Sequence, residues 1–299
     1  MLLKNIGEFG LIDLIKKRVR CVPSVVKGIG DDTAVMAHGR GGYLLFTTDM
    51  MAEGTHFRRS DDALAIGHKA LACNISDIAA MGGRPTYATV SLGIAPGTTV
   101  EAVRALYRGM ERLARRCGVS IVGGDTIRSE KLVINVSLLG EARKSELVTR
   151  AGAKKGHWIF VSGPLGRSFP SGKHLTFNPR LAESRFLVKR FRPSAMIDVS
   201  DGLAADLGHI LEASRVGAVV READIPLSRG ATVKQALEDG EDFELLFTVP
   251  PQTGRALAGL KSKKFHFYLI GEIVDGRGLA LMGRMHRKTR ISTKGFTHF

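Results

Sequence analysis

The stretch Gly28-Ile29-Gly30-Asp31-Asp32 places two adjacent carboxylates at the end of a glycine turn. Glycine lets the backbone turn tightly, and neighbouring acids at such a turn favour a bound cation that offsets their charge. Acids recur at further turns and expected strand ends, in Thr47-Thr48-Asp49, Asn74-Ile75-Ser76-Asp77, Gly123-Gly124-Asp125 and Asp198-Val199-Ser200-Asp201. We predict that these segments converge on one cluster of metal ions that carries a nucleotide triphosphate.

The length and composition are those of an ordinary globular protein. The chain has 299 residues, of which 44% are hydrophobic and 24% are charged, and this length predicts about two domains. Charge rises and apolar periodicity lapses over residues 141–147, so we predict domains at 1–143 and 144–299. No apolar run approaches the ~20 residues of a membrane span, and no secretory signal is recognisable. The sequence therefore predicts a cytoplasmic protein without a membrane partner.

The formal net charge is +15, which suits either nucleic acid or small polyanionic ligands. Neither arginine–aromatic interleaving nor a helix-turn-helix or zinc-finger pattern accompanies this charge. We interpret it as a basic surface suited to phosphorylated ligands, which disfavours nucleic acid as the partner. Cys21, Cys73 and Cys117 are too far apart for a zinc site or a disulfide framework.

Strand and helix patterns alternate in the first half and predict an α+β domain. A helix is expected before residue 20, after a turn at Gly7-Glu8-Phe9-Gly10. A strand over 43–48 ends on Thr47, Thr48 and Asp49, and a strand over 119–122 ends in a turn at Gly123-Gly124.

A helix is expected over residues 62–81, where Lys69, Cys73 and Asp77 are spaced by four and share one face. Small neighbouring residues predict close packing, and therefore a paired or metal-bound carboxylate at Asp77. In the second half, residues 163–193 are rich in glycine, proline and arginine, with one helical piece over 181–189. Strands are expected over 158–162, 196–199, 243–249, 265–270 and 278–282.

The acidic segments favour magnesium over other metals. Magnesium prefers carboxylate, carbonyl and phosphate oxygens, and six aspartates exceed the needs of one ion. Such a cluster supports phosphoryl transfer by positioning and charge neutralisation, with a structural calcium site as the alternative. Gly124 and Ser200 offer donors for phosphate oxygens. Arg150, before a glycine turn, suits a phosphate clamp or an ordinary surface position. A zinc cluster, a nucleophile elbow and a Walker lysine loop are absent from the sequence.

Taken together, these motifs resemble the thiamine-monophosphate kinase family, in the superfamily that includes aminoimidazole ribonucleotide synthetase and selenophosphate synthetase. Besides the acidic segments, the resemblance rests on Glu53-Gly54-Thr55-His56-Phe57, Lys69-Ala70-Leu71-Ala72-Cys73, Gly240-Glu241-Asp242-Phe243-Glu244-Leu245 and Gly295-Phe296-Thr297-His298-Phe299. It implies an α+β fold of two α/β-sandwich-type domains like those of aminoimidazole ribonucleotide synthetase. It also implies a ferredoxin-like N-terminal domain that forms a sheet barrel in a homodimer, with ATP near the domain junction.

The resemblance implies transfer of the ATP γ-phosphoryl onto thiamine monophosphate, the last step of thiamine diphosphate biosynthesis. Because the acceptor is already an anion, we assign no catalytic acid or base. Several Mg²⁺ ions would be held by Asp32, Thr47, Thr48, Asp49, Asp77, Asp125, Asp198 and Asp201. ATP would contact Tyr107, Gly124, Asp125, Arg150 and Ser200. Thiamine monophosphate would contact His56, Glu241 and Phe296.

Single residues of this set also have ordinary explanations. Tyr107 lies on an apolar helical stripe, which favours core packing, and His56 and Phe296 alone suit a loop and a packed terminus. The chain is shorter than the family between Gly166 and Met196, which bears on the edge of the second domain. The alternatives are another ATP-using synthetase of the same superfamily and a basic nucleic-acid-binding protein with a structural metal core.

Overall fold

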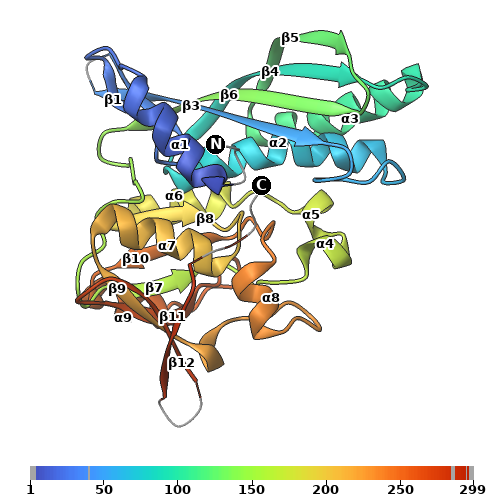
Figure 1. Ribbon diagram of the computed structural model, residues 1–299. Helices are drawn as coiled ribbons and strands as arrows, with labels where there is room; N and C mark the ends of the chain where they lie inside the picture. Colours follow the sequence, from blue (N-terminus) through green and yellow to red (C-terminus); the bar gives the residue numbers. More distant parts are fainter. Residues whose placement is uncertain (1–4, 40, 284–286, 294, 296–299) are drawn as a thin grey trace.

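Two mixed β-sheets, one from each half of the chain, form separate layers with helices between and around them (Figure 1). The computed structural model describes residues 5–39, 41–283, 287–293 and 295. Phe296, which the sequence predicts at the acceptor site, lies outside the described residues. No helix in the described ranges has the length and apolar character needed to cross a membrane.

The first sheet has six strands, and only its β4–β5 pair is parallel. Alternate side chains point to opposite faces of each strand, so Leu45 and Val136 are buried while Phe46, Met50 and Tyr87 are exposed on the other face. The strand order is β1 (Val25–Lys27), β2 (Ala34–His38), β3 (Gly42–Ala52), β6 (Val133–Arg143), β4 (Arg84–Ile94) and β5 (Ser120–Arg128).

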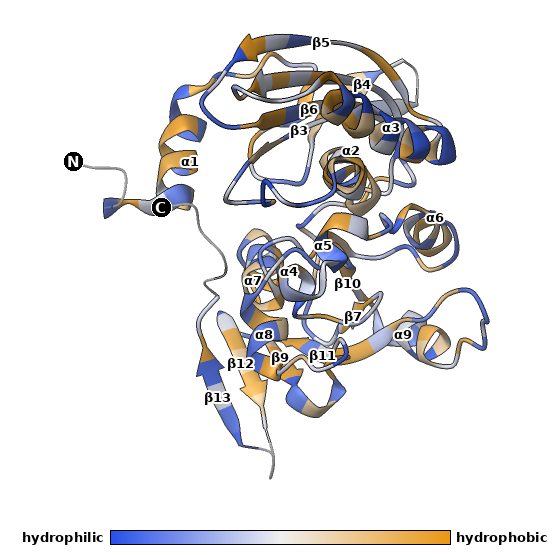
Figure 2. Ribbon diagram, turned by 90° about the vertical axis from the view of Figure 1, so that its right-hand side faces the viewer, coloured by the Kyte–Doolittle hydropathy of each residue, from blue (hydrophilic) through white to orange (hydrophobic). Residues whose placement is uncertain are grey.

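Helices α2 (Ala63–Ala80) and α3 (Val100–Cys117) cover the buried face of this sheet. The Asp62 side chain accepts from the Leu64 N–H and caps the start of α2. Helix α2 also contacts elements of the second half, so it lies between the two sheets, as Figure 2 shows from a second direction. Its position fixes the residues that face both halves.

The second sheet has seven strands, and only its β9–β12 pair is parallel. The strand order is β13 (Lys288–Ile291), β12 (Gly278–Met282), β9 (Gly217–Arg221), β11 (Tyr268–Val274), β7 (Trp158–Val161), β10 (Leu245–Val249) and β8 (Ala195–Asp198). The helices are α4 (Ser168–Ser171), α5 (Lys173–Thr176), α6 (Leu181–Arg190), α7 (Leu203–Ser214), α8 (Val233–Glu238) and α9 (Pro251–Ala258), with a 3-10 turn at Glu222–Asp224. Helix α7 packs in one apolar core of this half, and α6 packs in another.

The predicted α+β class and the helix near 181–189 are confirmed, whereas two predicted turns are wrong. Gly7 begins α1 (Gly7–Arg18) instead of lying in a turn before it. Gly123 and Gly124 lie inside β5, because the parallel ladder with β4 continues through Arg128. Gly124 sits so close to β4 that a Cβ there would lie 1.8 Å from the Val90 carbonyl oxygen.

Gly67 on α2 and Gly109 on α3 let the two helices cross closely. A Cβ on Gly67 would lie 2.0 Å from the Leu106 carbonyl oxygen. We expect Gly67→Ala to lower the free energy of unfolding by about 1–3 kcal/mol, because backbone must move to make room. Gly41→Ala is the control, since an added Cβ there meets no described atom within 4 Å. Equal stability of the two variants in thermal unfolding would contradict the close crossing.

Candidate active site

Three predicted metal ligands from distant parts of the chain meet where the two halves join. Asp32 precedes β2, Asp77 lies on α2 and Asp198 ends β8. One carboxylate oxygen from each lies within 4.8 Å of the others. Asp32 is 9% exposed and Asp198 is 2% exposed, so the negative charges gather largely out of contact with water.

Neighbouring hydroxyl groups orient two of these carboxylates. Thr47 Oγ1 donates to Asp77 Oδ2 over 2.5 Å, and Ser76 Oγ donates to Asp198 Oδ2 over 2.5 Å. Asp49 lies two residues after Thr47 on β3 and therefore faces the same side of the sheet. The predicted residues Thr47 and Asp49 thus join the group through strand alternation.

The like charges raise one another's pKa values. The pKa of Asp49 is raised to about 6, mainly by burial and then by the charges of Asp201 and Asp32. Burial also raises the pKa of Asp198 to about 6, although the Ser76 hydrogen bond lowers it in part. For Asp77, burial comes first and the charge of Asp49 second in raising the pKa well above its ordinary value. These carboxylates lack enough local positive charge to balance them.

Arg150 offsets part of this charge. Its Nη2 and Nε donate to Asp32 Oδ1 over 2.6 and 3.1 Å, and its backbone N–H donates to Asp31 Oδ1 over 3.0 Å. Lys27 Nζ lies 2.7 Å from Asp31 Oδ2, so the Asp31 carboxylate is paired and stabilises the turn that it belongs to. Burial nevertheless raises the pKa of Asp32 to about 7, against the lowering effect of Arg150.

The residues present fit hard divalent cations. Asp32 Oδ2 is buried and has no hydrogen-bond partner among the described residues. A buried carboxylate oxygen left unpaired is costly, and oxygen-rich, largely anionic donor sets favour magnesium or calcium over zinc. The cluster therefore has both the charge and the free ligand oxygen that such an ion requires.

A second group of potential metal ligands lies in the second half, and the sequence predicted only part of it. Asp201, Asp206 and His209 bring one ligand atom each within 4.8 Å of one another. Asp206 is 1% exposed, and its Oδ2 accepts from the Asp201 N–H over 3.0 Å. Sequence reasoning named Asp201 alone. The spacing of Asp206 and His209 by three residues on α7 was the available signal, because such residues share a helix face.

The predicted acceptor residues His56 and Glu241 meet at Lys69. Lys69 Nζ donates to Glu241 Oε1 and Oε2 over 2.6 and 2.7 Å and to the His56 carbonyl oxygen over 2.7 Å. The Glu241 N–H donates to the Ser200 carbonyl oxygen over 2.6 Å, which places predicted acceptor and ATP residues side by side. Sequence reasoning missed Lys69, although its spacing with Asp77 put both on one helix face.

Four predicted residues do not join the cluster within one chain. Thr48 points to the opposite face of β3, where its hydroxyl lies 3.0 Å from Ser137 Oγ, so its side chain does not reach this cluster within one chain. Gly124 and Asp125 are exposed on β5, at the sheet edge. Tyr107 packs against the first core from α3, as its apolar stripe suggests.

With this geometry described, the chain can be compared with known proteins. Residues 30–142 match the family model for the N-terminal domain of AIR synthase related proteins, and residues 135–284 match the model for the C-terminal domain. Thiamine-monophosphate kinase of Aquifex aeolicus is 35% identical, with 100% of both chains covered. The chain belongs to the thiamine-monophosphate kinase family. The kinase of Escherichia coli K12 is 34% identical, with 98% of each chain covered.

Solved structures of the family share the fold. The structure of AaThiL complexed with AMPPCP and TMP superimposes with a TM-score of 0.88 at 34% identity, covering 100% of this chain and 99% of that one. A crystal structure of the kinase from Stenotrophomonas maltophilia gives 0.74 at 33% identity, over 92% and 96% of the chains. The expected resemblance and the two-domain α+β fold of AIR synthase type are therefore confirmed.

The raised pKa values predict how pH affects the stability of this family member without metal. A carboxyl group with a raised folded-state pKa stabilises the fold below its unfolded pKa, and that contribution is lost as pH rises through the folded value. For Asp32, Asp49 and Asp198 these folded values are about 7, 6 and 6. We expect the melting temperature in a chelator to fall between pH 5 and 8, and Mg²⁺ to raise it more at pH 8. A chelated protein that gains stability steadily over this range would contradict the charge cluster.

Proposed function

We propose that the chain phosphorylates thiamine monophosphate to thiamine diphosphate, with ATP as the phosphoryl donor and Mg²⁺ as the metal. The observation that carries this proposal is the meeting of aspartates from both halves, one of them with a buried unpaired oxygen, beside the Lys69–Glu241 pair. Curated kinases of this family with near-complete coverage support the reaction. The bound AMPPCP and TMP of AaThiL support the two substrates.

The metal-binding part of the proposal assigns Asp32, Asp49, Asp77, Asp198 and Asp201 to several Mg²⁺ ions. Thr47 positions Asp77 through its hydroxyl group. When bound, Mg²⁺ neutralises phosphate charge and aligns the reacting groups. The protein supplies the fixed carboxylates, and it removes them from competing water through burial.

The substrate-binding part assigns residues to the two ends of the site. Arg150 and Ser200 would contact ATP. Gly124, Asp125 and Tyr107 are further proposed contacts, and since they lie away from the aspartate cluster, ATP would have to reach beyond the cluster to meet them. His56 and Glu241 would contact the acceptor, together with Phe296. Because the acceptor phosphate is already ionised, positioning suffices, and the proposal includes no protein acid or base.

A different synthetase activity of the superfamily is the alternative, and ATP consumption with a panel of acceptors separates the two. A coupled ADP-release assay with thiamine monophosphate and Mg²⁺ tests the main proposal directly. Absence of turnover above background would reject it. A nucleic-acid-binding role predicts instead salt-sensitive binding to generic DNA or RNA.

Asp49→Asn tests the shared-metal arrangement. We expect it to lower kcat by at least about 100-fold, because it removes metal-binding charge, while the melting temperature in chelator stays the same or rises. The rise follows because a buried repulsive charge is lost. Thr48→Val is the matched control on the opposite face of β3, and it should retain turnover. Full activity of Asp49→Asn would contradict the assignment.

We also propose a homodimer in which the first sheets form a barrel. Large apolar side chains on the uncovered face of this sheet support it: Phe46, Met50, Tyr87 and Val122 are 42%, 63%, 53% and 62% exposed. A monomer seldom leaves such a patch uncovered. The proposal includes a ferredoxin-like N-terminal domain over 1–143 and a second domain over 144–299. A cytoplasmic location follows from the need for ATP.

Charges on this face should prevent dimer formation. We expect the double variant Met50→Asp/Tyr87→Asp to be monomeric in size-exclusion chromatography with light scattering. Dimer formation would bury the two introduced carboxylates and remove their hydration, which is unfavourable. Leu227→Asp is the control, since Leu227 is an exposed apolar residue of the second half. A double variant that remains dimeric would place the interface elsewhere.

A further inference from the structure

Lys69 is almost completely buried, at 1% exposure, on the helix that lies between the two halves. Its ammonium group has three donors, and the structure gives it three acceptors: both oxygens of Glu241 and the carbonyl oxygen of His56. Glu241 lies 172 residues further along the chain, in the second half. One side chain therefore ties together the two described residues that the proposed function assigns to the acceptor.

The backbone of Glu241 is also held, in an uncommon conformation. Its φ is +55°, and that of Phe243 is +50°, in the left-handed region that residues with a Cβ seldom adopt. The N–H groups of Glu241 and Phe243 donate to the carbonyl oxygens of Ser200 and Val199 over 2.6 and 2.7 Å. These bonds fix the loop, and Lys69 fixes the direction of the Glu241 carboxylate.

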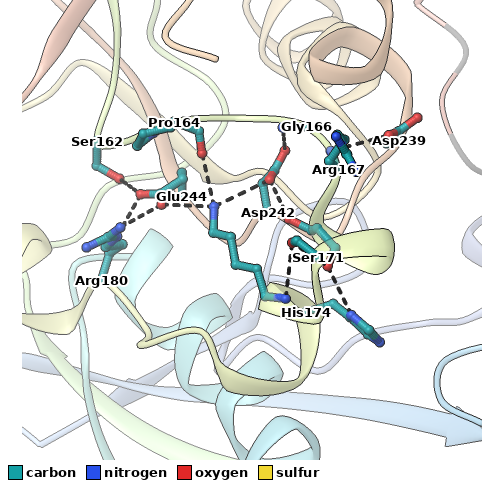
Figure 3. Close-up of polar contacts among 12 residues, drawn as sticks. Ser162, Pro164, Gly166, Arg167, Ser171, His174, Arg180, Asp239, Asp242 and Glu244 are labelled. Carbon is teal, nitrogen blue, oxygen red and sulfur yellow. Dashed lines mark hydrogen bonds and ion pairs between the residues drawn. The ribbon is translucent and has the colours of Figure 1, made fainter. Parts of the chain in front are cut away.

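The other two acids of this loop are held within the second half. Figure 3 shows Glu244 between Arg180 and Ser162, and Asp242 beside the backbone of Gly166. Arg180 donates to both Glu244 oxygens over 2.6 Å each. By contrast, Glu241 takes its cation from α2. The direction of its carboxylate therefore depends on the contact between the two halves.

Lys69 also lies toward the metal-binding end of the site. Its charge lowers the pKa of Asp49, against the dominant effects of burial and of Asp201 and Asp32. The Lys69 ammonium group thus contacts the two acceptor residues and also acts electrostatically on Asp49. We infer that Lys69 is a positioning residue that aims Glu241 and the His56 loop at the phosphorylated acceptor, and so sets affinity for the acceptor separately from affinity for ATP.

This inference rests on the proposed function, so wild-type turnover of thiamine monophosphate is measured first, and its absence would reject that function alone. Lys69→Met removes the cation and leaves the stem volume. We expect it to raise KM for thiamine monophosphate by more than about tenfold, with KM for ATP changed by less than about twofold. Lys69→Gln keeps a hydrogen-bond donor and should give a smaller increase, and it carries the test if Lys69→Met does not fold.

Lys173→Met is the matched control. Lys173, on α5, has its Nζ 3.4 Å from both Asp242 Oδ1 and Glu244 Oε1. Its loss therefore also removes a lysine that contacts this loop, while Arg180 and the hydroxyl groups still hold the two acids. It should keep the wild-type KM for thiamine monophosphate. Equal increases of both KM values in Lys69→Met and Lys69→Gln, or an increase in acceptor KM as large in Lys173→Met, would overturn the inference in favour of a purely structural pin.

Discussion

The rest of the structure depends on keeping several like-charged carboxylates together at the junction of the two halves. Asp32, Asp49 and Asp77 come from the first half, whereas Asp198 and Asp201 come from the second. Asp32, Asp49, Asp77 and Asp198 are each affected by the charges of neighbouring acids, and burial adds to the cost of ionising them. Cations bound among the ionised acids would offset this charge, and metal binding would then be coupled to the geometry of the junction.

Helix α2 converts this electrostatic requirement into a fixed geometry. Its small residues allow close contact with α3 through Gly67, and its opposite side packs against the second half. One face then carries Lys69 toward the Glu241 loop and Asp77 toward the acids that we propose to bind the metal. Because both side chains extend from one rigid element, the distance between the two ends of the site is set by helix rise and not by loop conformation.

Local patterns predict much of this site, and long-range contacts account for the remainder. Asp32 and Asp198 were predictable because the first follows a turn and the second ends a strand, whereas Asp49 lies inside β3 and Asp77 lies on α2. Strand alternation explains why the Thr48 side chain lies on the opposite face of β3. The β5 position of Gly123 and Gly124 depends on pairing with β4, which overrides the turn tendency of a glycine pair. The Lys69–Glu241 pair joins residues 172 positions apart, so spacing along one helix indicates only the face of Lys69 and not its partner.

Asp242 and Asp77 differ in how neighbouring groups act on their pKa values. Burial raises the pKa of Asp242, but the neighbours Lys173, Ser168 and Gly166 all lower it. For Asp77, in contrast, burial is reinforced by three other carboxylates, and only the Thr47 hydroxyl opposes it. Asp242 is therefore balanced within the fold, and it holds its loop in place. For Asp77, the proposed metal ion would supply the opposing positive charge, so it is the neighbouring charges, and not burial, that separate these two acids.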